Sequence, residues 1–227
     1  MRVIMESGFY LIYLVFIMGL GLYISIKSKE KRVYLYFGLA LFILGFGDAF
    51  HLVPRAVGLF THSLDEPSKT LATFLGIGKL VTSVTMTVFY GLVHLFVYKR
   101  SNSVRIPYVD ITVNVLIITR FILCAFPQNG WITNESNLLW GILRNIPFVL
   151  VGIIVIVASF KHLRQFKHFK VMWLAIILSF AFYIPVVLFA HLASWVGMLM
   201  LPKTICYMWI GIMALLDFKE SKSCKIS

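Results

Sequence analysis

Asp48, His51 and Arg55 are the residues of this chain whose types and spacing could carry chemistry. They lie three and four positions apart in the stretch 45–55, GFGDAFHLVPR, a spacing that places all three side chains on one face of a helix. The stretch closes a long apolar run, and ionisable groups inside a membrane span indicate a functional site by default. A carboxylate, an imidazole and a guanidinium together could bind a charged ligand, hold a metal ion or transfer a proton.

His191 could complete a catalytic or metal-binding group with two of these residues. Asp48 and His51 would supply two ligands to a divalent metal and His191 a third, leaving an open position for water as catalytic zinc sites do. Without a metal, the same three side chains could serve an intramembrane hydrolase as general acid and base. Haem between His51 and His191 is a further interpretation, ranked below the metal site. The structural alternative is that each histidine is a hydrogen-bonded packing residue.

Five basic residues are expected inside spans or at their outer ends: Arg55, Lys79, Arg120, Arg144 and Lys203. A charge at the bilayer centre costs about 2.5–3.5 kcal/mol on insertion scales, so each cation needs a compensating group. Those near the surface could extend to lipid headgroups, and Asp48 could pair with Lys79 or Arg120. One aspartate cannot neutralise five cations. We therefore expect a water-accessible, outward-opening basic pocket that binds an anionic small molecule or a lipid headgroup.

The elements that would position these residues are membrane-spanning helices. The chain has 227 residues, of which 60% are hydrophobic and 13% charged, a composition that excludes a water-soluble fold. Pro54 is expected to end or kink the second helix. The sequence predicts one all-α domain over 1–227, a polytopic bundle of the cell membrane with seven spans at about 8–27, 33–57, 70–98, 107–126, 138–160, 170–192 and 198–217.

The basic residues predict the orientation of this bundle. Lys69 is the only lysine or arginine in the loops 58–69 and 127–137. The positive-inside rule therefore places the N-terminus outside and the C-terminus in the cytoplasm. This topology also explains the net charge of +12, so nucleic acid is not expected as a partner. Fourteen of the 21 basic residues lie on the opposite side: Lys27, Lys29, Lys31, Arg32, Lys99, Arg100, Arg105, Lys161, Arg164, Lys167, Lys170, Lys219, Lys222 and Lys225.

A weak internal repeat relates the first three predicted helices to the last three, with the fourth as a linker. It aligns His51 with His191 and Lys79 with Lys203. Repeats of three parallel helices occur in small transporters, although coincidence explains the alignment equally well.

The residues assign the chain to no family. His191 is followed four positions later by Trp195, not by the second histidine of ceramidase-type membrane hydrolases. The proline–glutamine motif of small sugar transporters is also missing from the first helix of each half. Three functions remain, in this order: binding or transport of an anion, hydrolysis by Asp48, His51 and His191, and a structural or assembly role.

Overall fold

The computed structural model describes residues 2–28, 31–61, 64, 67–134, 137–190, 192 and 194–223. It has seven helices that are long and apolar enough to cross a membrane, and no strand within the described ranges, so the all-helical prediction is confirmed. The helices are α1 (Arg2–Lys27), α2 (Arg32–Phe60), α3 (Lys69–Ser101), α4 (Pro107–Ala125), α5 (Leu138–Leu163), α6 (Met172–Phe189) and α7 (Met200–Ser223), with short 3-10 turns η1 (Pro127–Asn129) and η2 (Ser194–Leu199).

Several helix boundaries differ from the prediction. The first helix begins at Arg2 and therefore includes Glu6, which the prediction left outside. The second continues through Pro54 and beyond the predicted 57 to Phe60, so it does not end at this proline. A proline removes one backbone hydrogen bond, which tertiary packing can offset. The sixth ends at Phe189 and not near 192.

Side-chain caps fix where two of the helices start. The Ser68 hydroxyl accepts a hydrogen bond from the backbone N–H of Leu71 at the start of α3. The Asn137 side chain accepts one from the backbone N–H of Trp140 at the start of α5. Such caps satisfy amide groups that a helix end leaves without partners.

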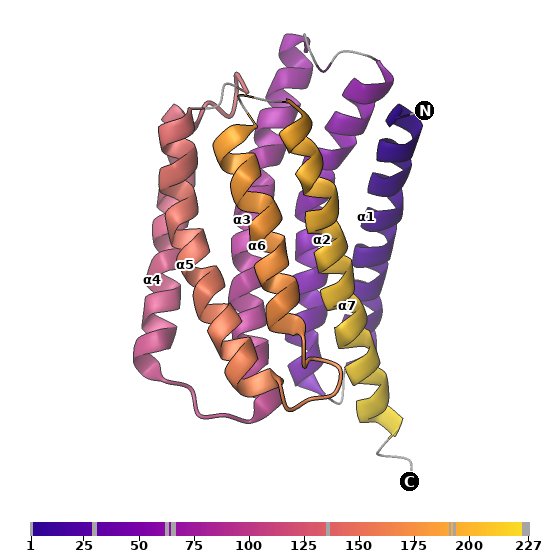
Figure 1. Cartoon of the computed structure of the whole chain (residues 1–227), viewed down its shortest axis with the longest axis vertical. Coiled ribbons are helices and arrows are strands. Elements are labelled where there is room, and N and C mark those ends of the chain that lie inside the picture. Colours follow the sequence, from indigo (N-terminus) through magenta and orange to yellow (C-terminus); the bar gives the residue numbers. More distant parts are fainter. Residues whose placement is uncertain are drawn as a thin grey trace.

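Six of the helices form a closed ring, in the order α1, α2, α3, α5, α6 and α7, and α7 packs back against α1 (Figure 1). The helix α4 lies outside this ring, against α3 and α5. It buries only Val113, Arg120 and Cys124 in the protein, which suits a peripheral position. The ring can therefore enclose polar groups away from lipid.

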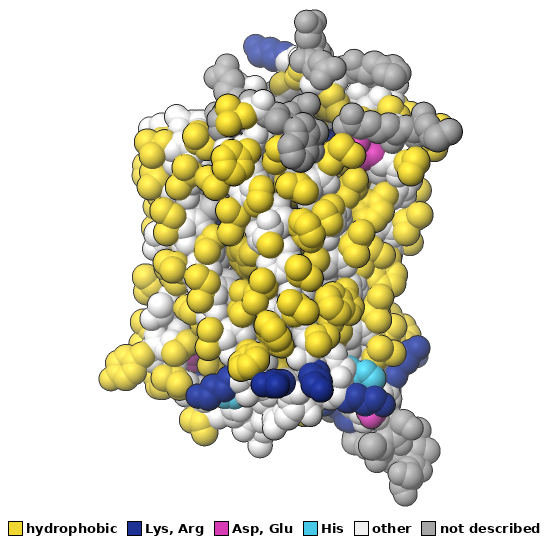
Figure 2. All heavy atoms as spheres, in the orientation of Figure 1, with side chains coloured by type: hydrophobic (Ala, Val, Ile, Leu, Met, Phe, Trp, Pro, Cys, Tyr) yellow, Lys and Arg dark blue, Asp and Glu magenta, His cyan; other side chains and the backbone are white. Residues whose placement is uncertain are grey.

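The two ends of the bundle carry different charge. The termini lie at opposite ends, which we call the N-terminal and C-terminal ends (Figure 1). In Figure 2 hydrophobic side chains cover the middle of the visible face, and a row of Lys and Arg side chains crosses its C-terminal end. Some of these cations have acidic partners, since Arg100 pairs with Asp217 at 2.7 Å and Arg105 with Asp110 at 2.9 Å.

Close approach of α2 and α3 depends on Gly47 and Gly78. A Cβ atom at Gly47 would lie 1.8 Å from Oγ1 of Thr85, and one at Gly78 would lie 2.3 Å from the carbonyl oxygen of Phe50. The Thr82 hydroxyl also donates to the carbonyl oxygen of Gly47 at 3.1 Å. Small residues allow this contact, as is common between membrane helices.

We expect Gly78→Ala to destabilise the protein, because its added methyl group meets backbone that can only move with the helix. The free energy of unfolding should fall by about 1–3 kcal/mol, measured in detergent. The control is Gly19→Ala, whose added Cβ has no atom within 4 Å. Equal stability of the two variants would contradict the assigned α2–α3 contact.

Candidate functional site

A polar cavity of about 320 Å³ lies inside the ring, in the half nearest the N-terminal end. The helices α2, α3, α5, α6 and α7 all contribute to its wall, and no acidic side chain is among the described residues that line it. His51 lines it as well. Four of the five predicted cations lie on the wall: Arg55, Lys79, Arg144 and Lys203.

Arg55 is the cation of this cavity that has a carboxylate partner. Its Nη2 lies 3.0 Å from Oε1 of Glu6 on α1, and its Nε donates to the Tyr10 hydroxyl at 2.9 Å. Tyr10 in turn donates to Glu6. Sequence analysis missed this pair because it began the first helix after Glu6. The signal was the spacing of four between Glu6 and Tyr10, which places both on one helix face.

Lys79 and Arg144 are held by neutral amides of the α4–α5 connection. Nζ of Lys79 donates to Oδ1 of Asn134 at 2.7 Å. Nη1 of Arg144 donates to Oδ1 of Asn129 at 2.6 Å, and the guanidinium lies 4.4 Å from the ring centroid of Trp131. These partners orient the two cations without cancelling their charge. The sequence predicts this connection only as a loop and does not indicate these contacts.

Lys203 on α7 is buried, with only 4% of its surface exposed, and its nearest partners carry no charge. Its Nζ lies 3.3 Å from Sδ of Met86 and 4.6 Å from the ring centroid of Tyr183. Aromatic rings and thioethers attract a cation but carry no net charge. Within the described part of the chain, no carboxylate lies within 4 Å of Lys79, Arg144 or Lys203.

Asp48 does not line the cavity, although it neighbours His51 on α2. It is buried, and its Oδ2 accepts a hydrogen bond from the Tyr13 hydroxyl of α1 at 2.6 Å. Its electrostatic interaction with Lys203 acts over a longer distance than an ion pair. The alternative of an ion pair between Asp48 and Lys79 or Arg120 is wrong, because neither cation lies within 4 Å of the Asp48 carboxylate.

Arg120 lies outside the cavity lining. It extends from the peripheral helix α4 into the bundle, where it is 1% exposed and its guanidinium lies 3.7 Å from the ring centroid of Phe148. Its three side-chain nitrogens have no hydrogen-bond partner among the described residues. Arg120 therefore contributes positive potential near the cavity but does not touch its interior.

The predicted metal and haem sites need His191, which lies outside the described residues. Of their other members, His51 lines the cavity and its Nδ1 is buried without a described partner, whereas Asp48 is bonded to Tyr13. The part of the chain that the structure describes holds no group of three His, Cys, Asp or Glu residues suited to a metal ion. Metal binding, haem binding and the repeat that aligns His51 with His191 stay predictions.

We expect the Glu6–Arg55 pair to stabilise the α1–α2 contact. A double-mutant cycle with Glu6→Gln and Arg55→Gln should give a coupling energy of about 1–3 kcal/mol in unfolding experiments. The cycle of Glu6→Gln with Lys79→Gln should be additive, because Lys79 bonds to Asn134 instead. Equal couplings in both cycles would show that the ion pair has no stabilising role.

No protein-family model, curated protein or solved structure matches this chain, so its function must be argued from its own residues and geometry.

Proposed function

We propose that this membrane protein binds an anionic small molecule or lipid headgroup in the cavity, and that binding there serves its uptake or transport. One observation carries the proposal. Lys79, Arg144 and Lys203 share a cavity wall, and no described carboxylate lies within 4 Å of any of them.

Mutual repulsion among these cations favours an anionic ligand. Like charges in one cavity repel each other with an energy that falls as the distance between them grows, and this repulsion is stronger inside a protein than in water. Water and ring contacts reduce this cost, but a bound anion would reverse its sign. A cavity with this potential also attracts anions from solution.

The cations keep hydrogen-bond donors free for a ligand. An ammonium group has three N–H donors and a guanidinium five. Lys79 directs one donor to Asn134 and Arg144 one to Asn129. Their remaining donors, which have no partner among the described residues, suit a phosphate or carboxylate group.

The distribution of basic residues supports outward access. Positive charge collects at the C-terminal end, which the positive-inside rule assigns to the cytoplasm (Figure 2). In the cell membrane, the cavity would then lie in the outer half of the bilayer and receive its ligand from outside.

The other two functions have less support in the geometry. Of the three residues proposed for a hydrolase, only His51 is a described part of the cavity wall. A purely structural role leaves the unused donors of Lys79 and Arg144 without a purpose.

The first test is calorimetric titration of inorganic phosphate into delipidated protein in a nonionic detergent. We expect binding that weakens with added salt and becomes about tenfold weaker or more, about 1.4 kcal/mol, in Lys79→Gln and in Arg144→Gln. The control is Lys69→Gln, which removes an exposed cation from the same end without changing the cavity wall.

Two results would count against anion binding. If wild-type protein does not bind phosphate, the proposed function fails. If the Lys79 and Arg144 variants bind as the wild type does but unfold at lower temperature, these residues have a structural role.

A further inference from the structure

The polar cavity adjoins an apolar groove between α5 and α6. The groove has a volume of about 230 Å³, and Asn145, Tyr183 and Val187 line both spaces. Its remaining lining residues are all aliphatic: Ile142, Ile146, Val149, Leu150, Ile184 and Leu188. A strongly basic space and a strongly apolar one therefore share a wall.

The groove runs along the helices, away from the N-terminal end. Its α5 residues extend from Ile142 to Leu150, which is about 12 Å at a rise of about 1.5 Å per residue. The cavity residues of α5 begin earlier, at Asn137. Since Ile146, Leu150 and Ile184 are exposed on the surface of the bundle, the groove opens sideways to lipid. This is the direction and the depth that an acyl chain takes below its headgroup.

Tyr183 and Asn145 mark the change from polar to apolar surroundings. The Tyr183 hydroxyl donates to Oδ1 of Asn145 at 2.7 Å, and Nδ2 of Asn145 donates to the Gly141 carbonyl at 2.7 Å. Both side chains therefore keep a hydrogen-bond partner within the protein when an apolar chain passes them. The ring centroid of Tyr183 also lies 4.6 Å from Nζ of Lys203.

We infer that the ligand is an anionic phospholipid of the surrounding bilayer, an inference that rests on the proposed function. Its phosphate group lies in the cavity against Lys79, Arg144 and Lys203. One acyl chain lies in the α5–α6 groove, and the lipid enters sideways between these two helices.

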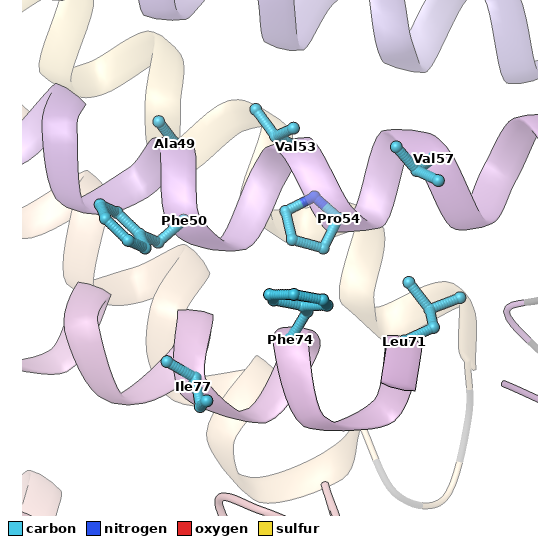
Figure 3. A pocket seen from close by; sticks show the side chains of 8 residues that line it. All are labelled: Ala49, Phe50, Val53, Pro54, Val57, Leu71, Phe74 and Ile77. Atoms are coloured by element: carbon cyan, nitrogen blue, oxygen red, sulfur yellow. The ribbon is translucent and has the colours of Figure 1, made fainter. Parts of the chain in front are cut away.

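The larger groove between α2 and α3 does not offer this combination. It has a volume of about 520 Å³ and is lined by apolar side chains alone, with Phe74 of α3 facing Pro54 of α2 and Phe50 further along α2 (Figure 3). None of its lining residues belongs to the polar cavity. It therefore gives an acyl chain no connection to the cations, and it serves as the competing location in the tests below.

The decisive experiment is native mass spectrometry of the full chain in a nonionic detergent, with added phosphatidylglycerol or with phosphatidylcholine of the same acyl chains. Ile184→Trp fills the groove and should weaken phosphatidylglycerol binding about tenfold or more, while phosphate binding stays within about twofold of wild type. Ile177→Trp is the matched control, because Ile177 and Ile184 lie on the same helix and are each 38% exposed, and Ile177 does not line the groove. It should change neither affinity.

The outcomes separate this inference from the proposed function. Equal binding of the two lipids, or unchanged phosphatidylglycerol binding in Ile184→Trp, would overturn the lipid inference even where phosphate still binds. If wild-type protein does not bind phosphate, the proposed function itself is overturned.

A second measurement, photolabelling, uses wild-type protein and therefore needs no variant to fold. Phosphatidylglycerol with a photoreactive group in one acyl chain should label peptides of α5 and α6 that contain Ile146, Leu150 or Ile184. An excess of unlabelled phosphatidylglycerol should remove this labelling and phosphatidylcholine should not. Labelling of the α2–α3 groove in its place, or equal competition by both lipids, would contradict the inference.

Discussion

Positive charge inside an apolar bundle is the constraint on which the site depends. Burying a cation is costly unless a partner compensates it, and the usual partner is a carboxylate. Here Lys79 and Arg144 bond to amide oxygens, and Lys203 lies against sulfur and aromatic rings. Neutral partners lower the cost of burial and fix each side chain in place, but they leave the positive potential of the cavity intact. An anion bound there, as proposed, would compensate charges that no described carboxylate within 4 Å compensates.

The helix α1 binds two acidic side chains that do not line the cavity, Glu6 and Asp48. Its Tyr10 donates to Glu6 and its Tyr13 to Asp48, on the α1 side of the ring. At the C-terminal end, Asp110 and Asp217 pair with arginines of that end. Across the described residues, the acidic groups therefore lie more than 4 Å from Lys79, Arg144 and Lys203. This separation explains how one cavity can be lined by four basic residues, of which only Arg55 has an acidic partner there.

The sequence predicted the parts of the structure that follow from hydropathy and from the energetic cost of burying a charge. Long apolar runs predicted all seven helices. The cost of a buried charge singled out five cations, of which all but Arg120 line the cavity: Arg55, Lys79, Arg120, Arg144 and Lys203. It did not reveal Asn129 or Asn134, because an asparagine in a connecting segment shows no periodic pattern and becomes a partner only when the helices bring it close. Glu6 was missed for a related reason, since a helix that extends beyond its apolar run has no hydropathy signal at its end.

Asn145 shows why a basic cavity and an apolar groove can share a wall. A polar side chain between the two spaces would normally expose an unpaired donor or acceptor to the apolar one, at a cost of about 1–3 kcal/mol. The Gly141 carbonyl accepts one N–H of its amide, and the Tyr183 hydroxyl donates to the amide oxygen. Asn145 and Tyr183 thus each have a partner within the protein, and the remaining residues of the groove are aliphatic. A ligand that is charged at one end and apolar at the other can contact both spaces at once, whereas a simple anion would leave the groove unused.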